Sequence, residues 1–333
     1  MRSDCVFTVE AHAGSHVWKN EGFAYVDQYA ESPTGDHLAF VAQDRDGWHV
    51  VVDGVLGPAF EGISKGPAFS LDGRHVAYVG ATESLEGHVM VDGKEALPAP
   101  MGIDQGAWGF TSDGRYVVAI RTSDGGLEVV VGGAKGPRFD SVIPDRKPLN
   151  TNTDLQLATS LTGGHYAYTG TRGSRRSVVV DGRETPLQDG LFAKWPLFSP
   201  AGSHLLYQVV PARPDSATTP AAIVVVDGVT FGLPGAINSM TFLPGDVPFI
   251  SVVIDLGMGT HRSIGYLLGV DPTTAPGLDM PPLPLPSSPN RPITAIDEGL
   301  NQNEIDVQAD GVVTVRGRPV GVVHGRRAPD VAR

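Results

Sequence analysis

The chain has 333 residues, and its 25 Lys and Arg against 37 Asp and Glu give a formal net charge of −12. Apolar residues make up 41% and charged residues 19%, which is enough apolar content for a packed core and excludes an intrinsically disordered chain. The acidic balance argues against a general nucleic-acid binder, and a single cysteine, Cys5, excludes an intrachain disulfide.

The N-terminal segment has no apolar core of the kind found in secretory signals. No apolar run reaches the roughly 20 residues that a bilayer-spanning helix needs. Together with the lone cysteine, these features lead us to expect a cytoplasmic, monomeric protein that does not bind membranes. The first predicted elements along the chain are two short strands, Val6–Val9 and His16–Lys19.

A repeated turn follows these strands. Its clearest copy is Phe69-Ser70-Leu71-Asp72-Gly73, which leads into a strand that begins with a histidine. The turn glycines of the five copies are residues 35, 73, 114, 164 and 202, so the copies are 38, 41, 50 and 38 residues apart. Self-similarity at a period of this size indicates a repeat architecture.

A second element follows each copy of the turn. It is a run of three apolar residues, mostly valine, that ends in a turn dipeptide, as in Val89-Met90-Val91-Asp92-Gly93, and it recurs at residues 50–54, 129–133, 178–182 and 224–228. Asp-Gly and Gly-Gly permit the positive φ angles of a tight hairpin. Each repeat therefore contains short apolar runs separated by turns, which predicts four antiparallel strands per repeat.

Four strands at this period are typical of a propeller blade, so we expect an all-β fold, a β-propeller. Five copies span about residues 23–237, and a sixth begins at Ser239. Its last strand is expected to follow a proline-rich insertion over residues 271–292. Seven four-stranded blades are expected, with six as the fallback.

The ends of the chain are expected to close this ring. Two C-terminal strands, at residues 304–307 and 312–315, remain after the sixth blade, and two N-terminal strands precede the first. We expect them to share one blade, because such a seam protects a ring from opening. The domain organisation would then be one propeller domain over residues 1–325 with a basic tail at residues 326–333.

The Phe-Ser-Pro-Asp-Gly-like turn, followed by a strand that starts with His or Tyr, resembles the WD40-like repeats of TolB-type bacterial propellers. The resemblance covers about residues 30–245 and recurs five times, and it implies the propeller fold. It implies no particular partner, because the separate N-terminal domain and export signal of TolB are not found in this sequence. The Gly-His and Trp-Asp pairs of eukaryotic WD40 repeats are also missing.

Most of the histidines follow the repeat, which favours structural roles for them. One equivalent position is occupied by His37, His75, His165 and His204, with Tyr116 in the third copy, and a second position is shared by His49 and His88. Residues repeated around a ring lie a whole blade apart, so they do not converge on one ligand unless they line the axis.

Short motifs give no catalytic, metal or cofactor site. Residues 62–66 match Gly-x-Ser-x-Gly, but no strand-to-helix turn surrounds them. Residues 87–94 depart from the spacing of a phosphate-binding loop. His12 and His16 lie on strand and turn rather than on one helix face, which leaves a metal site there a minor alternative. Residues 44–47 resemble the start of a calcium loop but lack its later ligands, so calcium is another minor alternative. We therefore assign no catalytic residue, metal or cofactor.

Charged residues in the expected ligand-side loops are sorted by blade. Loops of blades one and two carry acidic residues, namely Asp44, Asp46, Glu83, Glu86 and Asp104. The loops of blades three to five carry the candidate binding residues Arg121, Arg146, Lys147, Arg172, Arg175, Arg176, Lys194 and Trp195. Arginine forks beside an aromatic plane suit carboxylate or phosphate groups, so this sector predicts a small anionic ligand or an acidic segment of a partner protein.

Two function classes follow from these features. The first is a protein-binding or scaffolding propeller, which needs no catalytic constellation. The alternative is a propeller-fold lyase or hydrolase with a dispersed site at the axial channel mouth, for which Tyr25, Trp108, Arg172 and His16 are candidates. The first class is our expectation, with no nucleic acid or membrane among its partners.

Overall fold

The structure is a computed structural model. It describes residues 7–142, 157–173, 175–185, 191–211, 222–233, 235–255, 261–268, 270–272, 293–296, 305–308, 312–315 and 317–323. The regular elements in these ranges are all β-strands. The chain divides into two compact units, residues 1–186 and residues 187–333, and each is described by itself.

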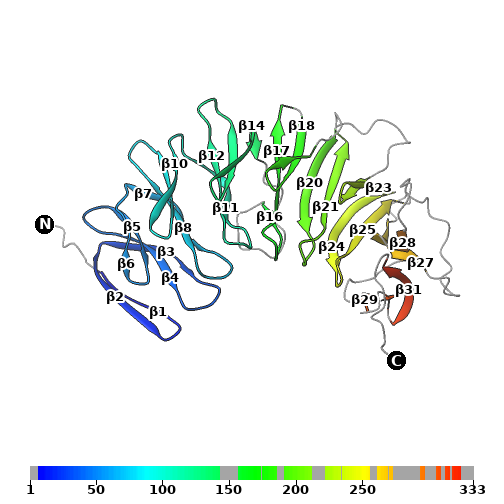
Figure 1. The fold of residues 1–333 in the computed structure, drawn as a ribbon, viewed down its shortest axis with the longest axis horizontal. Coiled ribbons are helices and arrows are strands. Elements are labelled where there is room, and N and C mark those ends of the chain that lie inside the picture. The colour runs from blue at the N-terminus through cyan, green and yellow to red at the C-terminus, as the bar shows by residue number, and fades with distance from the viewer. Residues whose placement is uncertain are drawn as a thin grey trace. The chain divides into compact units, whose positions relative to one another are not determined.

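The first unit contains an N-terminal hairpin and four sheets that follow one another in chain order (Figure 1). The hairpin is β1 (Phe7–Ala13) with β2 (His16–Phe23). Sheet 1 is β3 (Tyr25–Glu31), β4 (Leu38–Gln43), β5 (Trp48–Val52) and β6 (Val55–Leu56). Sheet 2 is β7 (Gly62–Phe69), β8 (Val76–Ala81), β9 (Gly87–Val91) and β10 (Lys94–Ala99). Sheet 3 is β11 (Ile103–Phe110), β12 (Tyr116–Arg121), β13 (Leu127–Val131) and β14 (Ala134–Phe139). Sheet 4 is β15 (Ser141–Val142), β16 (Ala158–Thr159), β17 (Tyr166–Arg172), β18 (Arg175–Val180) and β19 (Arg183–Glu184).

The second unit contains three further groups of four strands. Sheet 5 is β20 (Leu191–Phe198), β21 (Leu205–Pro211), β22 (Ala222–Val226) and β23 (Val229–Leu233). Sheet 6 is β24 (Ala236–Leu243), β25 (Val247–Asp255), β26 (His261–Leu268) and β28 (Ile293–Ile296). The C-terminal sheet is β27 (Val270–Pro272), β29 (Ile305–Val307), β30 (Val312–Val315) and β31 (Arg318–Val323).

The predicted repeat is confirmed at the level of sheets. Each of the five turn copies leads into the second strand of a sheet, and each apolar run forms its third strand. The sixth copy also forms a sheet, in which β28 pairs with β26 across residues 269–292, as expected for a delayed last strand. Most of the proline-rich insertion lies outside the described residues.

The expected sharing of one sheet by the two ends of the chain is wrong. Among the described strands, β1 and β2 pair only with each other, and the C-terminal sheet takes its fourth strand from β27. Val270–Pro272 supplies the antiparallel edge that the N-terminal strands were expected to supply, since it pairs with β31 in register. The N-terminal hairpin packs instead on sheet 1, where Ala11 and Phe23 bury Phe40 and Val51.

The turn dipeptides explain why each hairpin closes so tightly. In sheet 2, Asp92 and Gly93 have φ angles of 50° and 74°, the left-handed conformation that both central residues of a type I′ turn adopt. This turn matches the right-handed twist of the strands it joins.

Apolar clusters form between neighbouring sheets, so the core is a series of layers between sheets. One cluster joins sheets 1 and 2 through Val50 and Tyr78, and another joins sheets 3 and 4 through Val129 and Tyr168. In the second unit, clusters between sheets 5 and 6 and between sheet 6 and the C-terminal sheet follow the same rule. Each sheet is therefore buried on faces that neighbouring sheets cover.

One detail of this packing repeats with a size exchange. A Cβ atom on Gly80 of β8 would lie 2.4 Å from the Phe60 ring, and one on Gly170 of β17 would lie 2.4 Å from the Phe139 ring. In the interface between sheets 2 and 3, Ile120 of β12 occupies the position of these two glycines. Ala99 occupies the position of the two phenylalanines there. Both belong to the cluster between sheets 2 and 3. In two interfaces a phenylalanine ring therefore packs against a glycine, and in the third an alanine and an isoleucine take their places.

Candidate functional site

The repeated histidines form clamps with the aspartates of the turn dipeptides. His75 Nδ1 lies 2.8 Å from Asp92 Oδ2, while Asp92 Oδ1 accepts a hydrogen bond from the Val76 backbone N–H at 3.0 Å. The other three clamps have the same two bonds, and they are His37–Asp53, His165–Asp181 and His204–Asp227. Each clamp ties the start of a second strand to the turn after the third strand.

The third copy has no clamp, because neither the histidine nor the aspartate is present there. Its turn is one residue shorter, since the Thr111 N–H donates to the Arg115 carbonyl where the Ser70 N–H donates to the His75 carbonyl. The strand register therefore places Arg115 at the histidine position, not Tyr116 as the sequence predicts, and Gly132 at the aspartate position. The structural interpretation of these histidines is supported by their partners.

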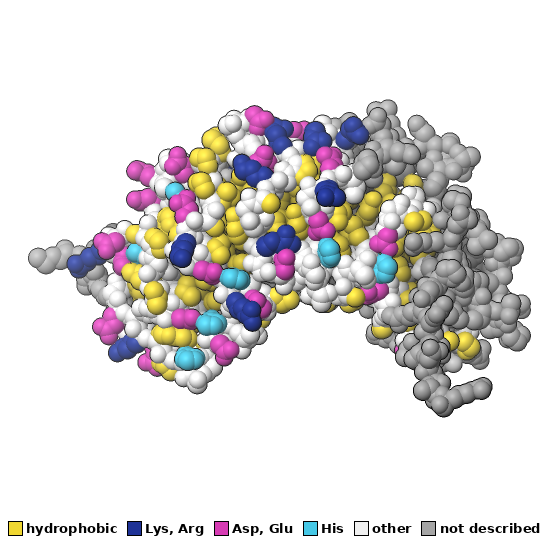
Figure 2. Space-filling model, in the orientation of Figure 1, with side chains coloured by type: hydrophobic (Ala, Val, Ile, Leu, Met, Phe, Trp, Pro, Cys, Tyr) yellow, Lys and Arg dark blue, Asp and Glu magenta, His cyan; other side chains and the backbone are white. Residues whose placement is uncertain are grey.

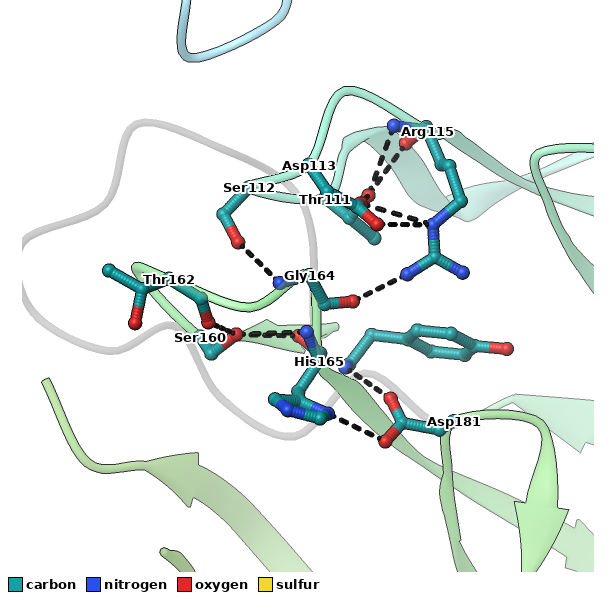
Figure 3. A network of polar contacts seen from close by, with 10 residues as sticks. Thr111, Ser112, Asp113, Arg115, Ser160, Thr162, Gly164, His165 and Asp181 are labelled. Carbon is teal, nitrogen blue, oxygen red and sulfur yellow. Dashed lines mark hydrogen bonds and ion pairs between the residues drawn. The ribbon is translucent and has the colours of Figure 1, made fainter. Parts of the chain in front are cut away.

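A serine, a histidine and an aspartate meet in each clamp, but they do not form a catalytic triad (Figure 3). Ser160 Oγ accepts a hydrogen bond from the His165 backbone N–H at 2.9 Å and donates to the Thr162 carbonyl at 2.5 Å. A triad requires the hydroxyl to bond the imidazole nitrogen that is not held by the aspartate. The hydroxyl holds the turn instead.

An arginine in the same network joins two sheets. Arg115 Nη2 donates to the Gly164 carbonyl at 2.6 Å, and its Nε donates to both carboxylate oxygens of Asp113 (Figure 3). Burial raises the pKa of Asp113, but hydrogen bonds from Arg115 and Thr111 outweigh that effect and lower the pKa below its usual value. Arg115 is therefore a structural cation between sheets 3 and 4.

The predicted basic residues are only partly described. Arg146 and Lys147 lie outside the described residues. Lys194 and Trp195 lie on β20 in the second unit, and their side chains are outside the description. Arg121 ends β12, and its Nη2 donates to Asp104 Oδ2 at 3.1 Å, so a predicted basic residue is paired with a predicted acidic one.

The guanidinium of Arg172 contacts a carboxylate, a backbone carbonyl and an aromatic ring. Its guanidinium makes two hydrogen bonds of 3.2 Å to the two oxygens of Glu184, and Nη2 donates to the Arg138 carbonyl at 2.9 Å. The guanidinium carbon lies 4.8 Å from the centre of the Phe139 ring, which is fully buried. Arg172 therefore covers a ring of the core.

Glu184 is a residue that the sequence did not single out. Burial raises its pKa, but hydrogen bonds from Ser177 and Arg172 and the nearby charge of Arg175 lower it by more, so the pKa is below its usual value. Glu184 therefore stays ionised, forms hydrogen bonds with Arg172 and is near the charge of Arg175. It lies 12 residues from Arg172 in the chain, on β19, and only the strand pairing brings them together.

A second network, also missed from the sequence, is centred on Arg138. Its Nε lies 2.7 Å from Asp124 Oδ2, and its Nη1 donates to Asp140 at 3.4 Å. Hydrogen bonds from Thr122 and Arg138 lower the pKa of Asp124 to about 2. The same pair raises the pKa of the Arg138 guanidinium. Asp140 also accepts the Gly173 backbone N–H at 2.7 Å, which connects this network to the hairpin of sheet 4.

The tip of the β17–β18 hairpin places like charges opposite one another. Arg172 and Arg175 are cross-strand partners, and Arg176 faces Thr171 one step further along. Like charges directly opposite in a sheet destabilise the pairing. Four arginines and three carboxylates gather around this tip, and these are Arg138, Arg172, Arg175 and Arg176 with Asp124, Asp140 and Glu184. Basic side chains lie beside acidic ones on the face in Figure 2.

The predicted acidic residues divide into structural and exposed groups. Asp44 Oδ1 lies 3.0 Å from His49 Nε2 and accepts the Asp46 backbone N–H at 2.8 Å. Burial raises the pKa of Asp44, while these bonds lower it by more. Asp44 is thus a turn residue paired with a buried histidine, whereas Glu83 and Glu86 are exposed.

The residues considered for an enzyme site each have a separate contact. Tyr25 packs edge-on against Trp48, His16 stacks on Trp18, and Trp108 lies against the core between sheets 2 and 3. Among the described residues, no group of three His, Cys, Asp or Glu side chains could hold a metal ion. No helix in the described part of the chain is long and apolar enough to cross a membrane.

Comparisons with known proteins concern the fold. No protein-family model matches the chain, and no curated protein matches it. Among solved structures, the hydrazine synthase of Kuenenia stuttgartiensis is 16% identical with a TM-score of 0.32, over 72% of this chain and 75% of that chain. TolB from Acinetobacter baumannii is 17% identical with a TM-score of 0.29, over 61% of this chain and 52% of its own. The β-propeller domain of Cps50 (Swd1) from Myceliophteria thermophila is 14% identical with a TM-score of 0.29, over 74% of this chain and 86% of its own.

TolB proteins and a propeller domain are thus among the structures that this chain resembles, as the resemblance of its repeat implies. Likeness of this extent assigns no site residue.

Proposed function

We propose that this chain is a binding or scaffolding propeller, and that the tip of the β17–β18 hairpin takes an anionic ligand or an acidic segment of a partner protein. The observation that carries the proposal is the cross-strand pair Arg172 and Arg175, with Arg176 beside them. Guanidinium groups gathered at one hairpin tip suit carboxylate or phosphate groups, which they bind through charge-assisted hydrogen bonds.

Arg172 has a distinct part in this arrangement. Its guanidinium is fixed by Glu184, by the Arg138 carbonyl and by the Phe139 ring, so it holds the tip in place. Arg175 is exposed and is the cross-strand partner of Arg172, and its charge contributes to the lowered pKa of Glu184. In the proposed site the exposed Arg175 is the first residue that an incoming anion meets, with Arg172 as its support.

The wider predicted sector remains part of the proposal. Lys194 and Trp195, on β20 of the second unit, belong to this proposal through the sequence alone, as do Arg146 and Lys147, which lie outside the described residues. Arg121 is the least suited of the set, because Asp104 already neutralises it.

The test is a single charge reversal with a matched control. Arg175→Glu alters the β17–β18 tip, and Arg183→Glu makes the same change at an exposed residue in the β18–β19 hairpin, at the opposite end of the same sheet. Binding of a fluorescein-labelled hexaglutamate peptide is followed by anisotropy at low and high salt, with inorganic phosphate as a competitor.

We expect Arg175→Glu to weaken peptide binding about tenfold, which corresponds to roughly 1.4 kcal/mol. Arg183→Glu should have little effect, and binding to the unaltered protein should weaken as salt rises. Equal affinities of the two variants, or binding that does not respond to salt, would show that these arginines are solvated surface.

A further inference from the structure

The turn between β8 and β9 has the same hydrogen bonds as the turn between β12 and β13. The Thr82 N–H donates to the Glu86 carbonyl at 3.1 Å, and the Leu85 N–H donates back to the Thr82 carbonyl at 2.9 Å. The second turn repeats both bonds, from Thr122 to Gly126 at 2.9 Å and from Gly125 to Thr122 at 3.0 Å. The two turns therefore match residue by residue, with leucine in one where glycine stands in the other.

The exchanged position is left-handed in both turns. Leu85 has a φ angle of 65°, and Gly125 has one of 83°. Glycine adopts this conformation without a steric penalty, whereas the Cβ atom of leucine crowds its own backbone there. In the described part of the chain, the other residues with positive φ that are not glycine are Gln28 and five aspartates, and aspartate side chains can bond the local backbone. Leucine has no such compensation.

The Leu85 side chain also gains no packing in return for this strain. It is 77% exposed, more than Leu71 and Met101, the other exposed large apolar residues of sheets 2 and 3. Met101, in the turn before β11, is 52% exposed. The two turns lie against each other, because a Cβ atom on Gly102 would be 3.4 Å from the Leu85 carbonyl oxygen. Two exposed apolar side chains thus belong to adjoining turns.

The surroundings of these side chains are acidic. Glu83 and Glu86 flank Leu85 in the chain, both are exposed, and neither forms an ion pair with another described residue. Arg121 bonds the Gly102 carbonyl through its backbone N–H, but Asp104 neutralises its guanidinium. The two exposed glutamates therefore give the Leu85 turn a negative charge.

We propose that Leu85 and Met101 form a docking site for a partner segment in which an apolar side chain is flanked by lysine or arginine. Strained backbone that lowers stability persists in proteins where the strained residue serves a function. An exposed leucine in the left-handed region would then be retained because a partner buries it. The two glutamates complement a basic segment and supply its orientation.

This site is separate from the arginine tip of sheet 4. It lies on sheets 2 and 3 and takes the opposite charge, so it goes beyond the anionic ligand proposed above. The hairpins of both sites join second to third strands, and both sites therefore lie at the same end of the sheets of the first unit.

Leu85→Gly is the decisive variant, because its two expected effects have opposite signs. The substitution restores the residue that the matching turn uses, so it should raise the midpoint of thermal unfolding by roughly one to a few degrees. It should also weaken the binding of a labelled peptide, Lys-Lys-Leu-Leu-Lys-Lys, about tenfold, as the loss of an interface anchor does. Loss of binding in a more stable protein excludes unfolding as its cause.

Leu71→Gly is the matched control. Leu71 is 56% exposed in the turn between β7 and β8, at the opposite end of sheet 2, and its loss should leave peptide binding unchanged. A peptide with serine in place of leucine should bind the unaltered protein more weakly than the leucine peptide. Glu83→Lys with Glu86→Lys should weaken binding and reduce its dependence on salt.

Three results would overturn the proposal. They are equal binding by Leu85→Gly and the unaltered protein, no preference for the leucine peptide over the serine peptide, and a lower unfolding midpoint for Leu85→Gly. A fourth is concentration-dependent self-association that Leu85→Gly abolishes, which would make a second copy of this chain the occupant. Arg175→Glu should leave this peptide's binding unchanged, and Leu85→Gly should leave hexaglutamate binding unchanged, so failure at one site is distinguishable from failure at the other.

Discussion

Gly80→Ala tests how adjacent sheets pack. Gly80 is not in the left-handed region, so a Gly→Ala change there would ordinarily stabilise the fold by about 0.4–1 kcal/mol through the unfolded state. Here the new Cβ atom would lie 2.4 Å from two ring carbons of Phe60. Forced overpacking of a core costs about 1–3 kcal/mol. We therefore expect a net loss of roughly 1–2 kcal/mol, opposite in sign to the ordinary effect.

The assay is thermal unfolding followed by circular dichroism, with urea unfolding as a second measure. For a unit of the size of residues 1–186, each kcal/mol corresponds to about 2–4 °C in the unfolding midpoint. The expected decrease is thus roughly 2–8 °C. An unchanged or higher midpoint would mean that the Phe60 ring moves away without cost, and the packing argument would fail.

A double variant sharpens the test, because another interface of this protein supplies the solution. Phe60→Ala alone removes the ring from Gly80 and from Tyr78, whose ring it meets edge-on at 6.4 Å, and should cost about 2–4 kcal/mol. Gly80→Ile alone should be the most damaging change. Together they recreate the pair Ala99 and Ile120, so the double variant should be more stable than the sum of the single effects predicts. Strict additivity would refute the size exchange.

Three further predictions concern the clamps, the acidic networks and the N-terminal hairpin. His75→Gln should lower the midpoint of thermal unfolding only slightly, since exposed ion pairs contribute about 0.2–1 kcal/mol. Asp92→Ala should lower it more, because it also leaves the Val76 N–H without its acceptor. A larger loss for His75→Gln than for Asp92→Ala would contradict the clamp. Asp124 has a folded pKa of about 2, so its contribution to folding stability is complete above the unfolded pKa of about 4 and is lost as the pH falls toward 2. Asp124→Asn should therefore make acid unfolding, measured by fluorescence, less steep. An unchanged profile would count against the Arg138 network. Removal of residues 1–23 should expose Phe40 and Val51, and so lower the midpoint of thermal unfolding and increase the binding of a hydrophobic dye. A truncated protein as stable as the full chain would show that the hairpin is dispensable.

The sheets and their turns could be predicted from the sequence because local chemistry determines them. Alternating apolar runs indicate strands, and Asp92-Gly93 and its equivalents indicate hairpins because few other dipeptides accept two positive φ angles. The structural role of His75 and its equivalents followed from their regular spacing. The predicted match of Tyr116 to these histidines is wrong, because the third turn is one residue shorter and the strand register places Arg115 there.

Contacts between sheets could not be derived from the same patterns. The partner of Arg172 depends on which strand edge meets which loop, and Glu184 and Phe139 reach it only through strand pairing and sheet packing. The same holds for Val270–Pro272, a short segment at the edge of a proline-rich stretch, which takes the place expected for the N-terminal strands. The sequence singled out Glu83 and Glu86 by their charge but not Leu85 between them, because its backbone strain is visible only in the dihedral angle. The repeat period and the turn residues therefore determined the strands and hairpins of this protein. Tertiary packing decided which charges neutralise each other and which side chains stay exposed, because both depend on distances between residues far apart in the chain.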